Sequence, residues 1–338
     1  FAQGIVHRTA QRNTDVLDFI EWLRAFNDVL PSRSKVGFYG LDLYSLHASM
    51  QAVIEYLERT DSQAALRAKE RYACFDRFGP DTESYTQGSG SVLSESCKSA
   101  VLAQLLEMQR RALEDTGAFY AEQNARVVAS AEEYYRTMLD REISSWNLRD
   151  RFMFDTLERL VAFLERRHAA RAKIIVWAHN THAGDARATS LGAGREINVG
   201  QLVRQAHPTS CRLIGFTTSM GTVTAASNWN GEAEQKTVRD PLPGSWEMLF
   251  HETGVPQFYL DLERARREYP PMQGRLLERA IGVVYRPATE FYSHYLEGRI
   301  ASQFDALFHF DRTRAVDPLE RMAQREDGEV AEIFPSGL

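Results

Sequence analysis

Cysteine is scarce in this sequence of 338 residues, and the three that occur, Cys74, Cys97 and Cys211, form no Cys-x-x-Cys pair. Paired thiols at that spacing mark many structural zinc sites and redox sites, so neither is predicted. An odd number of cysteines is also untypical of a secreted protein built on a disulfide framework. We therefore expect a reducing compartment, the cytoplasm.

Long apolar runs and an excess of basic residues are also missing. No stretch reaches the roughly 18 to 20 apolar residues that a membrane-spanning helix needs, and no basic segment followed by an apolar one opens the chain. Lysine and arginine number 40 against 46 acidic residues, which gives a net charge of −6. We therefore expect neither a membrane nor a nucleic acid as partner, and instead a small-molecule substrate. The oligomeric state is not predicted.

Several common catalytic motifs are absent. The sequence contains no Gly-x-Ser-x-Gly nucleophile motif and no Walker A loop. The stretch HETGV at His251 begins like the zinc motif His-Glu-x-x-His but lacks the second histidine, and GAGREI at Gly192 lacks the third glycine of a dinucleotide-binding loop. A serine hydrolase of the α/β-hydrolase type, a zincin and a nucleotide-binding site are therefore not predicted.

The hydrophobic pattern predicts an α/β protein. Apolar residues recur at spacings of three and four through residues 45–168, which indicates a series of helices. Short apolar runs typical of buried strands stand before and after that region. They occur at 35–43, 172–179, 211–225, 257–262, 279–286 and 304–311. We expect a single α/β domain over 1–338, with a mainly parallel sheet covered by helices and a large helical insertion at about 45–168.

One block stands out for its chemistry. The stretch VWAHNTHAGDARAT, Val176–Thr189, places His179 and His182 three residues apart at the end of a predicted strand, with Asp185 three further on. Ligands of open α/β sheets bind beyond the carboxyl ends of strands, and histidine acts there as base, acid or metal ligand. Three interpretations are open: a catalytic pair, a metal site formed with Asp185, or a polar turn whose histidines only hydrogen-bond the loop.

Several blocks in a fixed order resemble the erythromycin esterase family. They are VGFYGLDLYSL, SSWNLRDRFM, VWAHNTHAGDARAT, INVGQLVR, GSWEMLFHE, RAIGVVYRP and QFDALFHFDRTRAVDPLE, and the resemblance spans nearly the whole chain. It implies an α/β core with a helical insertion and a hydrolase that needs no cofactor and no metal. In that reaction a histidine activates water to attack an ester or a lactone. We expect the substrate to differ from erythromycin itself.

The resemblance also suggests roles for individual residues. His179 and His182 match the family's Ala-His-Asn-x-His block and are the expected catalytic pair, in an order that the sequence does not give. The expected substrate-contacting residues are Asn180, Arg149, Asp150 and Asp185. Arg149 and Asp150 fit equally well with an ion pair at the start of a helix.

The sequence departs from the family pattern at its beginning. The family's general-base histidine lies in a Gly-Glu-x-x-His block, followed by a glutamate at a strand end, and neither occurs here. The chain starts at Phe1 without methionine, so we expect it to be N-terminally incomplete. Two alternatives stay open: a metal-dependent hydrolase using His179, His182 and Asp185, or a catalytically silent protein that binds a ligand.

Three further polar residues are weaker candidates. Asp42 follows the predicted strand at 35–43, where it orients a histidine or an arginine or, more simply, caps the strand end. Tyr292 and His294 are candidates to line a cleft, but we expect surface or packing roles for them. Ser245 and Glu247 match the start of a helix, as N-cap and first-turn acid.

Overall fold

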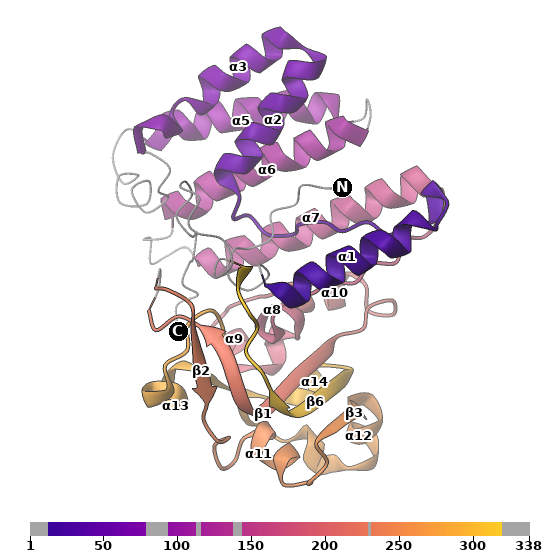
Figure 1. The fold of residues 1–338 in the computed structure, drawn as a ribbon, viewed down its shortest axis with the longest axis vertical. Helices are drawn as coiled ribbons and strands as arrows, with labels where there is room; N and C mark the ends of the chain where they lie inside the picture. The colour runs from indigo at the N-terminus through magenta and orange to yellow at the C-terminus, as the bar shows by residue number, and fades with distance from the viewer. Residues whose placement is uncertain (1–12, 79–93, 113–115, 138–143, 229–230, 320–338) are drawn as a thin grey trace. The chain divides into compact units, whose positions relative to one another are not determined.

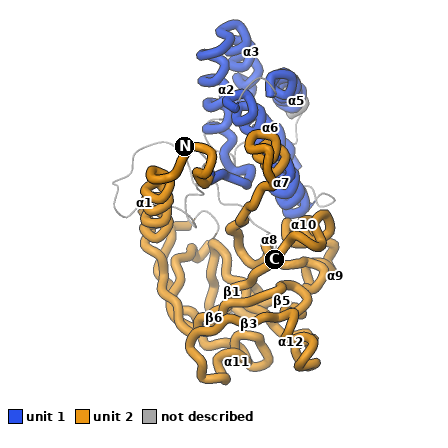
Figure 2. The backbone as a smooth tube through the Cα atoms, turned by 90° about the vertical axis from the view of Figure 1, so that its right-hand side faces the viewer, with its two compact units in different colours: residues 1–7, 37–159, 326–332 blue, residues 8–36, 160–325, 333–338 orange. Residues whose placement is uncertain are grey.

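The computed structural model describes residues 13–78, 94–112, 116–137, 144–228 and 231–319. The chain divides into two compact units, shown in different colours in Figure 2. Unit 1 contains Gly37–Arg159, whereas unit 2 contains Arg8–Val36 and Leu160–Arg325. Among the helices of the described ranges, none combines the length and the apolar character needed to cross a bilayer.

Unit 1 is helical, as expected for the insertion. Figure 1 shows its elements in indigo to pink. They are α2 (Leu46–Thr60), α3 (Ser62–Tyr72), the 3₁₀ turn η2 (Phe75–Phe78), α5 (Ser94–Arg111), α6 (Thr116–Thr137) and the first part of α7 (Ser145–His168). Helix α2 buries Leu46, Val53 and Leu57, whose spacings place them on one face that packs against α6. The expected helical insertion is therefore present.

A disulfide bond joins Cys74 and Cys97 in unit 1. The argument against a disulfide framework did not anticipate this bond, because folding brings two cysteines 23 residues apart to a Cα–Cα distance of 5.6 Å. Cys211 is a free cysteine. The number and spacing of cysteines therefore carry no argument for a reducing compartment.

Unit 2 contains a mixed sheet of four strands in the order β2-β1-β6-β3 (Figure 1). These strands are β1 (Ile214–Ala225), β2 (Glu234–Val238), β3 (Gln257–Asp261) and β6 (Ala306–Thr313), and a separate antiparallel pair is formed by β4 (Leu276–Arg279) and β5 (Tyr295–Gly298). Only β1 and β6 run parallel, because β2 and β3 pair with them in the antiparallel sense. The α/β class is confirmed, but the described sheet is mostly antiparallel rather than mainly parallel.

Three of the six expected strands are confirmed and three are not. The runs at 211–225 and 257–262 contain β1 and β3, and 304–311 overlaps β6, whereas 279–286 begins where β4 ends. Residues 35–43 and 172–179 belong to no strand. In the second of these segments Ile175 is 96% exposed and Trp177 63% exposed. An apolar run indicates extended backbone, but a strand also needs a hydrogen-bonding neighbour, and none pairs with these segments among the described residues.

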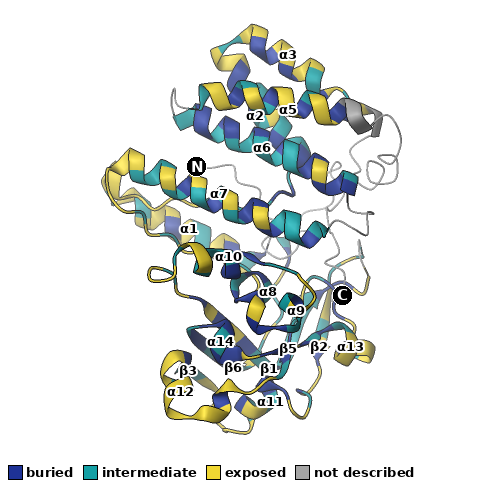
Figure 3. Ribbon diagram, turned by 180° about the vertical axis from the view of Figure 1, so that it is seen from behind, coloured by how far each residue is buried: buried dark blue, intermediate teal, exposed yellow. Residues whose placement is uncertain are grey.

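The helices of unit 2 are mostly short. They are α1 (Thr14–Asp28), α8 (Asn180–Ala183), α9 (Ser190–Ala193), α10 (Val199–Ala206), α11 (Trp246–His251), α12 (Leu262–Glu268), α13 (Glu290–Ser293) and α14 (Ile300–Gln303), with 3₁₀ turns η1 (Ser32–Ser34), η3 (Ala186–Ala188), η4 (Pro270–Gln273) and η5 (Pro287–Thr289). Ser245 caps α11 by accepting from Met248 N, as predicted. Trp246, Phe250 and Leu307 form the centre of a buried cluster. Most of α12 is exposed, as Figure 3 shows.

Helix α10 lies unusually close to the backbone of the histidine block. A Cβ atom on Gly200 would lie 2.2 Å from Ala183 O and 2.3 Å from Gly184 O. Both neighbours are backbone atoms, which cannot move aside as a flexible side chain can. Glycine at position 200 is therefore required for this packing.

We predict that Gly200→Ala lowers the free energy of unfolding by about 1–3 kcal/mol, because overpacking outweighs the better helix propensity of alanine. The control is Gly282→Ala, where a Cβ would meet nothing within 4 Å. Urea denaturation of the two variants checks this. Equal stabilities would show that α10 does not pack as described.

Candidate functional site

The histidine block forms a tight turn directly after the extended segment 172–178. His179 is the N-cap of the four-residue helix α8, and its Nδ1 accepts from Thr181 N at 3.2 Å. The helix ends at Gly184, whose N–H donates to Asn180 O. A Cβ on Gly184 would lie 2.6 Å from the side chain of Gln303. The turn is therefore closed at its start by a histidine and at its end by a glycine.

Both ring nitrogens of His179 have partners. Nε2 lies 3.0 Å from Ile281 O, and Nδ1 lies 2.9 Å from Thr181 Oγ1. Because a carbonyl oxygen only accepts, the proton is on Nε2, while Nδ1 accepts. Although His179 is an exposed residue overall, desolvation of its imidazole and the nearby His182 lower the pKa of His179 to about 4. His179 is therefore neutral at pH 7 and is used to hold the turn.

Asn180 fixes the turn to the sheet. Its Nδ2 donates to Phe216 O at 2.7 Å, and its Oδ1 accepts from Phe216 N at 3.1 Å. These two bonds satisfy both backbone groups of a residue in β1. Asn198 also fixes the turn, because its Nδ2 donates to the backbone carbonyl of Thr181 at 2.7 Å. In this structure Asn180 therefore fixes the turn to β1, and its expected contact with substrate stays a prediction.

His182 is the buried histidine of the block, with 8% of its surface exposed. The backbone N–H of His182 donates to the backbone carbonyl of His179 at 2.9 Å within the turn. Two residues later, Gly184 packs on Gln303, and Asp185 N donates to Gln303 O at 3.0 Å. His182 is therefore placed by a backbone that is bonded before and after it.

Asp185 is 4% exposed and bonded to two arginines. Arg187 donates to both carboxylate oxygens, at 2.9 and 2.7 Å, and Arg204 lies 3.4 Å from Oδ2. Burial raises the pKa of Asp185, but the two arginines outweigh that effect, and the pKa is lowered overall. Asp185 is thus an ionised anchor of the loop.

The hydrogen bonds and ion pairs of His179 and Asp185 bear on metal binding. The donor atoms of His179 and Asp185 are already used by protein partners, so a metal bound with His182 would have to displace them. Across the part of the chain that the structure describes, no group of three or more His, Cys, Asp or Glu residues has a geometry that could hold a metal ion.

Arg149 and Asp150 belong to unit 1, whereas the histidine block belongs to unit 2. The Nε and Nη2 atoms of Arg149 donate to the carboxylate of Asp42, with the shortest contact at 2.6 Å, and its guanidinium lies 4.6 Å from the centre of the Tyr44 ring. Asp42 thus orients an arginine, one of the two roles considered for it. Asp150 is completely buried.

The weaker candidates have the expected surface and packing roles. Tyr292 is 84% exposed, whereas His294 is buried. The Nε2 of His294 accepts from Arg286 N at 2.9 Å.

Two buried glutamates near the turn were not identified from the sequence. Glu247 accepts from Arg279 N at 3.0 Å, and Glu278 accepts from Gln303 Nε2 at 3.3 Å. One carboxylate oxygen of each glutamate and Oε1 of Gln303 have no hydrogen-bond partner among the residues that the structure describes. The sequence predicts Glu247 only as a first-turn acid of a helix, and no sequence signal marks either glutamate as a buried carboxyl group.

The pKa values of the two glutamates are raised above the usual range of a glutamate. Burial raises the pKa of Glu247 to about 7. Burial and the neighbouring Glu247 raise the pKa of Glu278 to about 8. Gln303, which contacts Gly184, is the side chain between this pair and the histidine turn.

We predict that the ring of His179 does not titrate between pH 5.5 and 8.5 and carries its proton on Nε2. The measurement is ¹⁵N–¹H NMR of the histidine rings, with His179→Gln to assign the resonance. A titration midpoint between pH 6 and 7 would contradict the neutral N-cap.

We also predict that Glu278→Gln flattens the decline of stability with rising pH. Because the folded pKa of about 8 exceeds the unfolded value, the stabilising contribution is complete below about pH 4 and is lost as pH rises to about 8. The wild-type slope from one such group is about 1.4 kcal/mol per pH unit. Urea denaturation at pH 5, 6.5 and 8 measures it.

The control for this experiment is Glu297→Gln on the neighbouring strand β5, where the side chain is 60% exposed. It should keep the wild-type slope. An unchanged slope in Glu278→Gln would show that Glu278 is ionised in the folded protein at neutral pH.

Comparison with known proteins places the chain in a family. The model of the erythromycin esterase family matches residues 6–313. A crystal structure described as a succinoglycan biosynthesis protein aligns with a TM-score of 0.72 and 18% identity, over 91% of this chain and 72% of that one. The crystal structure of a Bacillus cereus protein aligns with a TM-score of 0.73 and 18% identity, over 90% of this chain and 73% of that one.

A third similar structure is a mutant of the erythromycin esterase EreC in its open conformation. It aligns with a TM-score of 0.55 and 16% identity, over 90% of this chain and 73% of that one. At these identities the three structures support the fold, while the family match covers most of the sequence. The chain belongs to the erythromycin esterase family.

Proposed function

We propose that the protein is a metal-independent hydrolase of a carboxylic ester or lactone, in which His182 exchanges protons with the attacking water. The observation that carries this proposal is the position of His182, which is buried in a turn whose backbone is hydrogen-bonded before and after it. His179 uses both ring nitrogens to close the turn. His182, in the same turn, is the histidine assigned to proton transfer.

The reaction needs one base and one carbonyl carbon. The imidazole of His182 takes a proton from water as the oxygen attacks the carbonyl carbon of the ester. The tetrahedral intermediate then breaks its bond to the alkoxide oxygen, which receives the proton from His182. The products are a carboxylic acid and an alcohol, or a hydroxy acid from a lactone.

Family membership and fold support this reaction type, and the rigid turn supports the assignment of His182. A base must stay within hydrogen-bond reach of the water that it activates. The backbone around His182 is held by Asn180 on one side and by Asp185 on the other. Such positioning limits the movement of the imidazole relative to a bound substrate.

The metal-dependent alternative is less well supported. It requires His179, His182 and Asp185 as ligands, and two of these already have strong protein partners. A cation would bind the carboxylate only at the cost of its ion pairs with two arginines, which leaves those charges without a partner.

A silent ligand-binding protein is the second candidate function. The observation that favours it is that His179, Asn180 and Asp185 all stabilise the turn itself. If the folded wild type hydrolyses neither short esters nor lactones, this second function is the better account.

In a full-length form that includes the family's Gly-Glu-x-x-His block, we expect His182→Gln to lower hydrolysis of p-nitrophenyl butyrate and of a macrocyclic lactone about 100- to 10,000-fold, because a group that takes part in proton transfer is removed. His168→Gln, at the end of α7, is the matched control and should keep full activity. Circular dichroism and melting temperature confirm folding. Active, folded His182→Gln would rule out the role of His182, and loss of activity on dialysis against EDTA would favour the metal-dependent reaction.

A further inference from the structure

A hollow in unit 2 lies outside the histidine block. It has a volume of about 490 Å³ and is lined by residues around α10, α12 and α14, including Arg204, Thr209, Arg212, Glu263, Arg266 and Asp305. None of its lining residues lies between Val176 and Thr189. Its size is that of a site for a small molecule rather than for a single ion.

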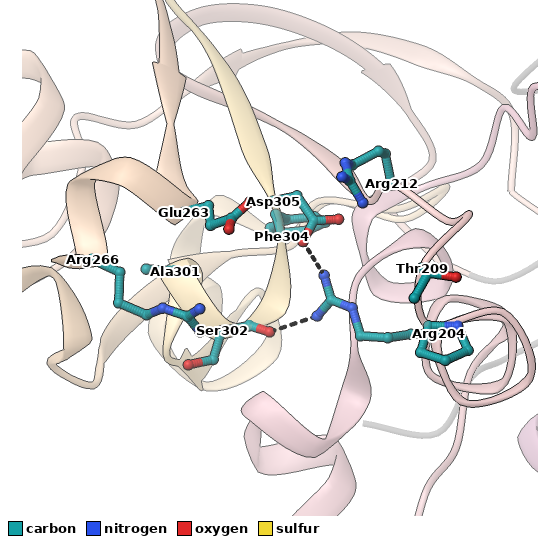
Figure 4. Close-up of a pocket in the computed structure, with 10 residues that line it drawn as sticks. Arg204, Thr209, Arg212, Glu263, Arg266, Ala301, Ser302, Phe304 and Asp305 are labelled. Atoms are coloured by element: carbon teal, nitrogen blue, oxygen red, sulfur yellow. Dashed lines mark hydrogen bonds and ion pairs between the residues drawn. The ribbon is translucent and has the colours of Figure 1, made fainter.

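Three arginines surround this hollow. In Figure 4 the side chains of Arg204 and Arg212 extend toward it from one side, and that of Arg266 extends from the other. The arginines come from α10, from the residues before β1 and from α12. Guanidinium groups converging from separate elements can bind the oxygens of one anion from several directions.

The two carboxylates of the hollow are already neutralised. Asp305 accepts from Arg204 Nη2 at 2.8 Å and from Leu213 N at 2.7 Å. Glu263 accepts from Arg267 Nη1 at 3.0 Å. Because both acids are paired, they cancel little of the charge of the remaining arginines.

Arg212 and Arg266 have no such compensation. Arg212 donates only to the neighbouring carbonyl of Cys211, at 2.9 Å, and neither arginine is paired with a carboxylate of the described residues. Both are exposed. Two uncompensated positive charges therefore meet at one hollow of a chain whose net charge is −6.

Arg204, on the same side of the hollow as Arg212, is held in place by other residues of unit 2. Its Nη1 donates to Ser302 O at 2.8 Å, and its Nη2 pairs with Asp305, as the dashed lines in Figure 4 show. Only 21% of its side chain is exposed. The hydroxyl groups of Thr209 and Ser302 also line the hollow and can donate to an oxyanion.

We propose that this hollow binds a small molecule through a phosphate or carboxylate group held by Arg212 and Arg266. Phosphate esters and polycarboxylates share the required chemistry, several anionic oxygens within the span of two guanidiniums. The site is distinct from the histidine turn, so it does not depend on the proposed hydrolysis. Arg204 connects the two regions because it also contacts Asp185.

The test is binding of inorganic pyrophosphate and of citrate, each titrated by calorimetry with sodium chloride adjusted to constant ionic strength. The wild type should bind at least one of them saturably, with a dissociation constant on the order of a millimolar. The double variant Arg212→Ala/Arg266→Ala should weaken that binding by at least about tenfold. Binding of pyrophosphate alone indicates a phosphate ligand, and binding of citrate alone a carboxylate ligand.

The matched control is the double variant Arg33→Ala/Arg264→Ala, which removes the same charge from exposed positions of unit 2 that do not line the hollow. It should bind like the wild type. Melting temperatures in chloride verify that all the variants are folded. The proposal is overturned if the wild type binds neither anion, or if the pocket variant binds as tightly as the control.

Discussion

The guanidinium of Arg204 is the contact on which the arrangement of unit 2 around the histidines depends. It pairs with Asp185 in the histidine block and with Asp305 before β6, and it donates to Ser302 O at the end of α14. Only a planar cation with several fixed donors can bridge a helix, a loop and a strand start in this way. Removing it would leave two largely enclosed carboxylates short of a partner, which costs more than the pair itself contributes.

This anchoring explains why two histidines in one turn are so different. With Asp185 fixed, the four residues of α8 have little freedom, and the ring of His179 is directed at Thr181 N and Ile281 O. Two partners that require opposite protonation at the two nitrogens stabilise the neutral ring. His182 follows three residues later, on the buried side of the same turn. In this structure His179 caps the turn in which His182 is buried, and the catalytic roles of the two rings stay predictions.

The sequence predicted local features well and pairing poorly. The α/β class, the helical region, the cap at Ser245 and the strands β1, β3 and β6 follow from apolar spacing and capping chemistry, which act within a few residues. Contacts between distant residues decide the direction of the strands, the formation of the disulfide and the absence of a strand at 172–179. A single sequence gives no signal for such contacts. For the same reason the sequence predicts the block as a candidate site but gives no signal for the contacts of its members. Asn180 could be identified as polar, but its two bonds to Phe216 require the fold.

The buried carboxyl groups behind the turn follow from the same packing. Gly184 lies against Gln303, and a Cβ on Gly298 would lie 2.8 Å from Glu278 Oε2 and 3.2 Å from Gln303 Oε1. With so little room, Glu278 and Glu247 cannot both carry full charge at low energetic cost, since unpaired buried charges are strongly destabilising. Protonation is the simplest remedy, and it makes a carboxyl group a hydrogen-bond donor for the unpartnered oxygens nearby. A neutral, tightly packed support also preserves the geometry of the histidine turn without adding a charge that would perturb it.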